Sequence, residues 1–126
     1  MIDPKDYYAG VSEAQFRRGL CRLAEAYKWQ WRHFTETTKR VRRGDKYVTI
    51  GDHDARGIPD LLLFHAERGI HMVWEVKTNK GKLTDYEAEM LYLYDRCGIE
   101  ARVARPRDWD ELRNILRGVL VMDEDA

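Results

Sequence analysis

The chain has 126 residues, a length that suits one domain better than two. Hydrophobic residues make up 44% and charged residues 35%, a balance that is typical of a folded protein and excludes an intrinsically disordered one. Because 22 Lys and Arg balance 22 Asp and Glu, the net charge gives no indication of a nucleic-acid partner, and only a local patch can do so.

The N-terminal part predicts a loose arm followed by an amphipathic helix. Residues 1–11 contain no apolar run that could serve as a signal peptide, so we expect a flexible arm and an intracellular, cytoplasmic protein. No window approaches the length of a membrane span, so we expect no membrane partner. Ser12 and Gln15 form a capping-box pattern, and apolar residues at spacings of three and four predict a helix from Glu13 to about Trp29.

The next part of the chain changes from aromatic to basic. Alternating aromatic residues predict a strand over Trp29–Phe34. The hydrophilic region 35–57 follows, in which Tyr47–Ile50 predicts a short strand or hairpin arm, and Asp52–Asp54 with Gly57 predicts a loop.

Two short apolar runs predict a pair of antiparallel strands, because their lengths and flanks suit strands better than helices. These runs are Leu61–Phe64 and Met72–Val76, and Glu67-Arg68-Gly69 forms the turn between them.

The C-terminal third predicts a helix, a strand and a last helix. Thr84 caps a helix over Asp85–Arg96, alternation predicts a strand over Ile99–Ala104, and Asp108 caps the last helix. The element order predicts an α/β fold with a mixed β-sheet of four or five strands flanked by α-helices. We expect one domain over residues 12–118 and a solvated acidic tail over 119–126.

The residues with the clearest chemical significance are Asp60, Glu75 and Lys77. Asp60 opens the first of the paired strands, and Glu75 and Lys77 end the second. Glu75 and Lys77 are two residues apart, so their side chains point to the same face. An antiparallel hairpin brings the start of the first strand beside the end of the second, so we expect all three residues to converge at one edge of the sheet.

These residue types suit phosphodiester hydrolysis. Two carboxylates and a main-chain carbonyl, here that of Val76, are suitable ligands for a hard divalent cation such as Mg²⁺. Such a cation neutralises phosphate charge and activates water, and a neighbouring lysine orients or deprotonates that water or stabilises the transition state. The ordinary alternative is a Pro-Asp loop beside an exposed Glu–Lys pair. The apolar strands that flank both motifs favour a site.

Several motifs together resemble the VRR-NUC branch of the PD-(D/E)xK nuclease superfamily. The motifs are Gly57-Ile58-Pro59-Asp60-Leu61-Leu62-Leu63, Glu75-Val76-Lys77 and Gly81-Lys82-Leu83-Thr84, and the resemblance extends from about Ser12 to Leu116. It implies a restriction-endonuclease-like core and a Mg²⁺- or Mn²⁺-dependent nuclease that acts on DNA. Stand-alone members of this branch occur in phages and bacteria, and some cut branched DNA as homodimers.

The resemblance assigns roles to matching positions. Asp60 and Glu75 would be metal ligands, Lys77 the catalytic lysine, and Glu13 the family's acid on helix one, which completes the site directly or through water. Glu13 also has an ordinary interpretation, because an acid in the first turn favours the helix dipole. Where the family presents a glutamine near the start of the helix after Thr84, this chain has Glu87. Glu87 can hydrogen-bond a metal-bound water, but its negative charge would face phosphate.

Contacts to DNA are expected from two groups of basic residues. The first group lies between the aromatic strand and the apolar runs, and the second follows the Glu75–Lys77 strand. The alternative for the first group is a solvated loop that makes no contact with DNA. The candidates are Lys39, Arg40, Arg42, Arg43, Lys80 and Lys82. His33 either touches the scissile phosphate or is an ordinary strand histidine. Tyr7 and Tyr8 either stack on unpaired bases or belong to the loose arm.

The sequence therefore predicts a metal-dependent DNA endonuclease that selects DNA by structure, such as branched or junction DNA, in replication, recombination or repair. One domain presents one active centre, so cutting both strands predicts a homodimer, through the apolar side of the Met90–Tyr94 helix or the last helix. Another nuclease of the superfamily, such as a nickase, exonuclease or junction resolvase, is one alternative. The other is a DNA-binding or regulatory module that kept the fold and lost catalysis.

Overall fold

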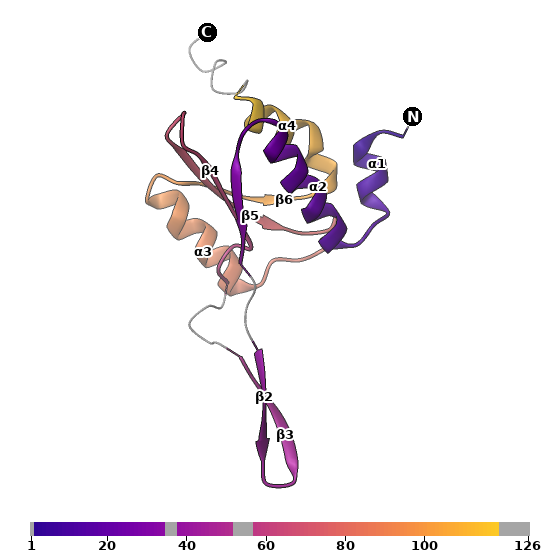
Figure 1. Cartoon of the computed structure of the whole chain (residues 1–126), viewed down its shortest axis with the longest axis vertical. Helices are drawn as coiled ribbons and strands as arrows, with labels where there is room; N and C mark the ends of the chain where they lie inside the picture. Colours follow the sequence, from indigo (N-terminus) through magenta and orange to yellow (C-terminus); the bar gives the residue numbers. More distant parts are fainter. Residues whose placement is uncertain (1, 35–37, 52–56, 119–126) are drawn as a thin grey trace.

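The centre of the fold is a four-stranded mixed sheet with the strand order β1-β4-β5-β6 (Figure 1). Its strands are Gln30–His33 (β1), Leu61–His65 (β4), Ile70–Val76 (β5) and Glu100–Ala104 (β6). β4 pairs antiparallel with β1 and β5, and β6 runs parallel to β5. The computed structural model describes residues 2–34, 38–51 and 57–118, so the predicted loop at Asp52–Asp54 and the predicted tail 119–126 lie outside it. Within these ranges the predicted mixed sheet flanked by helices is confirmed.

The β4–β5 hairpin was predicted from its two apolar runs, and the structure confirms it. Leu61 pairs with Trp74 and Leu63 with Met72, and all four side chains are buried. Residues on one face of a strand alternate with those on the other, so this set faces one side of the sheet and builds the core there. Gly69 supplies the left-handed backbone (φ 65°) that the turn needs.

Two helices cover this apolar face. Helix α2 (Glu13–Ala26) begins with the predicted capping box and ends three residues before the expected position, because Lys28 adopts a left-handed conformation (φ 69°). Helix α4 (Trp109–Arg117) follows the short 3₁₀ helix η2 (Pro106–Asp108), and the side chain of Asp108 makes no capping hydrogen bond. The core residues of these helices are Phe16, Leu20, Cys21, Ala24, Trp109, Leu112 and Leu116.

Helix α3 (Asp85–Arg96) connects the parallel strands β5 and β6 and packs against both. Its bounds and its Thr84 cap are as predicted. Val73 points away from the face that carries Met72 and Trp74, yet it is fully buried. The sheet therefore has helices on both faces, and Glu75, two residues after Val73, points to the second face.

The prediction of a loose N-terminal arm is wrong for residues 4–9, which form helix α1 (Pro4–Ala9). Asp3 caps this helix by accepting a hydrogen bond from the Lys5 N–H at 2.9 Å. The Tyr8 ring stacks on Trp109 with 4.9 Å between ring centroids. A six-residue helix has little stability of its own, so this tertiary contact explains why local sequence signals did not predict it.

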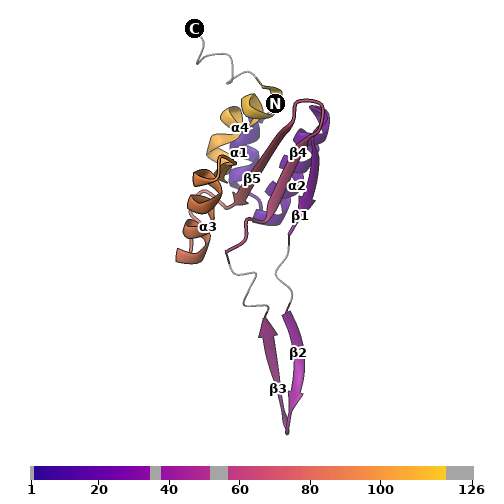
Figure 2. The ribbon, with the colours of Figure 1, turned by 90° about the vertical axis from the view of Figure 1, so that its left-hand side faces the viewer.

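A second, two-stranded sheet lies within the hydrophilic region 35–57. The expected hairpin arm at Tyr47–Ile50 is strand β3 (Lys46–Gly51), and its partner β2 (Thr38–Arg43) was not predicted. Figures 1 and 2 show this hairpin projecting away from the four-stranded sheet, which it does not join. No helix in the described ranges is both long enough and apolar enough to cross a lipid bilayer.

Candidate active site

The segment Gly57-Ile58-Pro59 leads into β4 through a narrow space. Gly57 has a left-handed backbone (φ 78°), and a Cβ atom there would lie 2.4 Å from the carbonyl oxygen of Tyr86 on α3. Pro59 is fully buried. Any other residue at position 57 would be strained by both its backbone angle and this contact. The glycine thus lets the chain pass against α3 and fixes the entry of Asp60.

Asp60 is anchored to both neighbouring strands. Its Oδ1 accepts a hydrogen bond from the Val76 N–H at 3.1 Å, and its carbonyl oxygen accepts one from the Phe34 N–H at 2.8 Å. In the antiparallel pairing of β4 with β5, Leu61 lies opposite Trp74. Asp60 precedes Leu61 and Glu75 follows Trp74, so Asp60 and Glu75 lie beside each other. The expected convergence of the start of β4 with the end of β5 is therefore present.

Lys77 lies between two acids at the end of β5. Its Nζ is 3.0 Å from Oε1 and 3.1 Å from Oε2 of Glu87, and 3.6 Å from Oε2 of Glu75. Glu75 is only 5% exposed. Glu87 belongs to the capping box of α3, where its Oε1 also accepts a hydrogen bond from the Thr84 N–H at 2.8 Å. Glu87 thus connects the helix start to the lysine.

The environment of Asp60 favours its protonated form. Burial raises the pKa of this carboxyl group to about 6, although the hydrogen bond from Val76 favours the ionised form. The negative charge of Glu13 also raises the pKa, and the positive charges of Arg17 and Lys77 oppose the increase. Asp60 therefore titrates close to neutral pH.

The same effect is larger at Glu75. Burial raises its pKa to about 9, and a side-chain hydrogen bond with Glu87 adds to the increase. The negative charges of Asp60 and Glu87 act in the same direction, and Lys77 opposes them. Of these two acids, Glu75 therefore holds a proton more readily than Glu87.

Lys77 keeps its positive charge in this arrangement. Burial disfavours the charge, but the hydrogen bond and the negative charge of Glu87 outweigh burial, and the pKa of Lys77 is raised. For Glu87, burial again disfavours the charge, and the hydrogen bonds from Glu75, Thr84 and Lys77 nevertheless lower its pKa to about 2. The site therefore holds an ammonium group against a carboxylate, and Lys77 is not a proton acceptor in this state.

The start of α2 adds charges of both signs. Glu13 occupies the first turn of α2, and its charge acts on both Asp60 and Lys77. Arg17, four residues later, was not predicted as part of the site, but its charge acts on Asp60 and lowers the pKa of His33, for which burial is the larger cause. Arg17 lies four residues after Glu13 and therefore on the same helix face, and this spacing was the sequence signal that could have placed it in the site.

The predicted DNA-contacting residues fall in two places. Lys80 and Lys82 are exposed in the loop after β5. This loop is held by Arg105, whose guanidinium donates to the carbonyl oxygens of Thr78 and Gly81 at 2.6 Å each. The other four candidates lie on β2. Among these four, the structure describes only the side chain of Arg42, which is exposed. The remaining three are Lys39, Arg40 and Arg43.

The donor atoms suit a hard divalent cation. Burial, and to a smaller extent the negative charges of neighbouring acids, raise the pKa values of Asp60 and Glu75, and a cation between them would favour both ionised forms. Among the described residues, no three His, Cys, Asp or Glu side chains form a group that could hold an ion. The predicted set has only two carboxylates and the main-chain carbonyl of Val76, and Lys77 lies against Glu75 in this structure. The residues present therefore fit a metal by their chemistry.

Comparisons of the chain with protein-family models, with curated proteins and with solved structures found no match. The function is therefore inferred from the residues of the site and their arrangement.

Proposed function

We propose that the protein is a nuclease that hydrolyses phosphodiester bonds of DNA with Mg²⁺ or Mn²⁺. The observation that carries the proposal is the convergence of Asp60, Glu75 and Lys77 where β4 begins and β5 ends. The antiparallel pairing of an Asp-led strand with a Glu-x-Lys strand also supports the resemblance to the PD-(D/E)xK superfamily and a restriction-endonuclease-like fold.

Each residue has a defined role in this proposal. Asp60, Glu75 and the carbonyl of Val76 would hold the cation, and Glu13 would complete the site directly or through water. The bound cation supplies charge neutralisation at the phosphate and lowers the pKa of coordinated water. In the hydrolysis, the water oxygen would form a bond to phosphorus and give up a proton, the bond from phosphorus to one sugar oxygen would break, and that oxygen would take up a proton as it leaves.

Lys77 acts as a fixed positive charge. Its ammonium group lies against Glu75 and Glu87 and has a raised pKa, so it stabilises negative charge rather than accepting a proton. Glu87 holds Lys77 in place, which gives a role to the acid that replaces the family's glutamine. This arrangement favours stabilisation of the transition state over deprotonation of water, two roles that the sequence left open.

We also propose that two copies assemble, because one chain presents one active centre. The last helix does not have a free apolar side, because Trp109, Leu112 and Leu116 are buried in the core. On α3, in contrast, Leu93 is 46% exposed. Sedimentation equilibrium should give twice the mass of one chain, and Leu93→Glu should give a single chain. A wild-type protein that sediments as one chain would contradict this proposal.

The nuclease is tested with labelled linear duplex, single-stranded, flap and four-way-junction DNA. The wild type is compared with Lys77→Met, Asp60→Asn and the control Lys28→Met, each with Mg²⁺, Mn²⁺ or EDTA. Lys28 is an exposed lysine just beyond the other end of α2. We expect metal-dependent cutting that falls about 100-fold or more in Lys77→Met and Asp60→Asn but not in the control.

The pattern of substrates separates the alternatives. Preference for flap or junction DNA would support a structure-selective endonuclease, and stepwise loss of nucleotides from ends would identify an exonuclease. Binding of DNA without cutting in any metal would favour a catalytically inactive DNA-binding or regulatory module. Full activity in Lys77→Met would contradict the assigned centre.

A further inference from the structure

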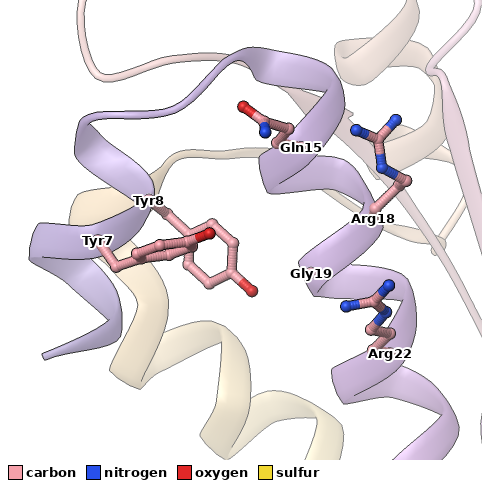
Figure 3. A pocket seen from close by; sticks show the side chains of 6 residues that line it. All are labelled: Tyr7, Tyr8, Gln15, Arg18, Gly19 and Arg22. Atoms are coloured by element: carbon pink, nitrogen blue, oxygen red, sulfur yellow. The ribbon is translucent and has the colours of Figure 1, made fainter. Parts of the chain in front are cut away.

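A second polar pocket lies between α1 and α2, on a side of α2 that the candidate active site does not use. It has a volume of about 200 Å³. Figure 3 shows the rings of Tyr7 and Tyr8 pointing from α1 toward α2, with Gln15, Arg18 and Arg22 along α2. The lining residues are Tyr7, Tyr8, Gln15, Arg18, Gly19 and Arg22. We infer that this pocket binds an unpaired nucleotide of a nucleic-acid strand, with the phosphate on Arg18 and Arg22 and the base on Tyr7.

The arginine pair is the cationic part of the pocket. Arg18 and Arg22 are exposed and four residues apart, so they lie on one face of α2. Neither forms an ion pair with any residue that the structure describes. Like charges at this spacing destabilise a helix slightly, so the stability of the fold does not explain the pair. Two arginines one helical turn apart on the same face can both direct guanidinium groups to the oxygens of one phosphate.

The tyrosines form a rigid aromatic wall. The Tyr8 ring stacks on Trp109. A Cβ atom at Gly19 would lie 2.2 Å from the Tyr8 hydroxyl oxygen, so the glycine makes room for the tyrosine ring. Tyr7 lies edge-on to Tyr8, with 5.0 Å between centroids, and is 52% exposed. An exposed ring held by a fixed neighbour is a suitable platform for stacking an unpaired base.

The place of the pocket relates it to the proposed nuclease site, on which this inference rests. Both are built on α2, where Glu13 and Arg17 face Asp60 and where Arg18 and Arg22 follow. Glu13 and Arg22 are about 14 Å apart along the helix axis at 1.5 Å per residue. These two residues are about two and a half turns apart and lie on opposite sides of α2, so a strand with its scissile phosphate at Asp60 would reach the pocket by passing around this helix. The pocket would select DNA that has an unpaired segment beside the cut.

The test measures binding without cutting, in EDTA, by fluorescence anisotropy of a labelled ten-nucleotide oligo-dT. The variants are Arg18→Gln/Arg22→Gln and Tyr7→Ala. The control Arg96→Gln/Arg117→Gln removes the same charge from the ends of α3 and α4. We expect Kd to rise about 10-fold or more in the arginine variant and about 5-fold or more in Tyr7→Ala, and less than about 2-fold in the control. Unchanged Kd in the first two variants, with an unchanged thermal midpoint, would overturn the inference.

Small ligands separate the phosphate from the base. Thymidine 5′-monophosphate and inorganic phosphate are titrated separately, and NMR follows the Tyr7 ring and the arginine side chains. We expect both ligands to shift the arginine signals, and only the nucleotide to shift the Tyr7 ring. Equal effects of the two ligands, or none, would overturn the assignment of Tyr7 as a base platform.

The inference and the proposed function fail separately. Cutting is the readout for Lys77→Met, and affinity for oligo-dT is the readout for the arginine variant. If wild type cuts DNA while the arginine variant binds like wild type, the pocket inference is overturned and the nuclease stands. If wild type cuts nothing while the arginine variant loses affinity, the pocket stands and the nuclease is wrong.

Discussion

The fold favours the protonated form of the buried Glu75 carboxyl group, whereas a metal ligand must be ionised. Its pKa of about 9 lies above the ordinary glutamate value of 4.5, and the pKa of Asp60, about 6, lies above the ordinary aspartate value of 3.8. For an acid with a raised pKa, the folded protein binds the proton more tightly than the unfolded chain. The stability that Glu75 contributes is therefore complete below about pH 4.5 and is lost as the pH rises toward 9.

Glu75→Gln should make the protein more stable at pH 8 while abolishing metal-dependent cutting. The amide keeps a donor for Glu87 and cannot ionise, so the loss of stability with rising pH disappears. Thermal unfolding followed by circular dichroism at pH 4, 6 and 8 measures this. The midpoints of variant and wild type should agree at pH 4 and separate at pH 8, and Glu67→Gln, an exposed acid in the β4–β5 turn, is the control. A variant less stable than wild type at pH 8 would show that Glu75 is ionised in the fold.

At this scale the sequence predicted which residues meet but not how their charges are arranged. The closeness of Asp60, Glu75 and Lys77 follows from a two-residue spacing and a hairpin, both visible in the chain. The contact of Lys77 with Glu87 depends on where α3 crosses the sheet, and the charge of Arg17 acts on Asp60 only because α2 begins beside β4. Such contacts depend on packing between elements, which no local pattern encodes.

Helix α3 shows how one element serves both the fold and the site. Its first turn is closed by two reciprocal hydrogen bonds: the Glu87 N–H donates to Thr84 Oγ1 at 3.1 Å, and the Thr84 N–H donates to Glu87 Oε1 at 2.8 Å. The same Glu87 carboxylate accepts a hydrogen bond from Lys77. The start of the helix therefore sets the position of the lysine.

Two substitutions at position 87 should separate capping from the ion pair. Glu87→Gln keeps the capping box and removes the charge beside Lys77, whereas Glu87→Ala removes both, at a further cost of about 1 kcal/mol. Urea unfolding of the two variants measures the difference, with Glu89→Gln, an exposed acid on the same helix, as the control. Equal stability of the alanine and glutamine variants would show that the cap contributes nothing. Cutting by Glu87→Gln reports whether the acid is needed in place of glutamine.

The elements that were predicted correctly carry their own local signals, and the missed ones do not. Helix α3 has a cap, an apolar period and a terminal glycine, so its bounds follow from the chain. Helix α1 depends on Tyr8 stacking on Trp109, a contact between residues about a hundred positions apart. Strand β2 is rich in Lys and Arg, which are not typical of strands, and only its pairing with β3 makes it one.

At the scale of the molecule, the chain divides into a sheet that holds the site and a hairpin that stands apart from it. Among the described residues, β2 and β3 pair only with each other, and both views of the ribbon show them extending away from the four-stranded sheet. The hairpin carries five of the 22 Lys and Arg residues in a chain whose formal net charge is zero. Long-range attraction to DNA therefore depends on where the positive charges lie rather than on their sum.

Replacing residues 38–51 by Gly-Ser-Gly should weaken DNA binding while leaving the rest of the fold intact. An isolated two-stranded hairpin adds little to the stability of a sheet it does not join, so the thermal midpoint should change by only a few degrees.

A second variant keeps the hairpin but changes Lys39, Arg40, Arg42 and Arg43 to glutamine. Binding of duplex and junction DNA in EDTA is measured across salt concentrations. If all four cations contact phosphates, the slope of log K against log salt should become shallower by about 3.6 in the glutamine variant, and by at least that much in the replacement, which also removes Lys46. Equal slopes in wild type and the glutamine variant would mean that these cations contact no phosphate. Weakened binding in the replacement alone would assign the effect to the hairpin's backbone or shape, and unchanged binding in both would leave Lys80 and Lys82 as the contacts to examine.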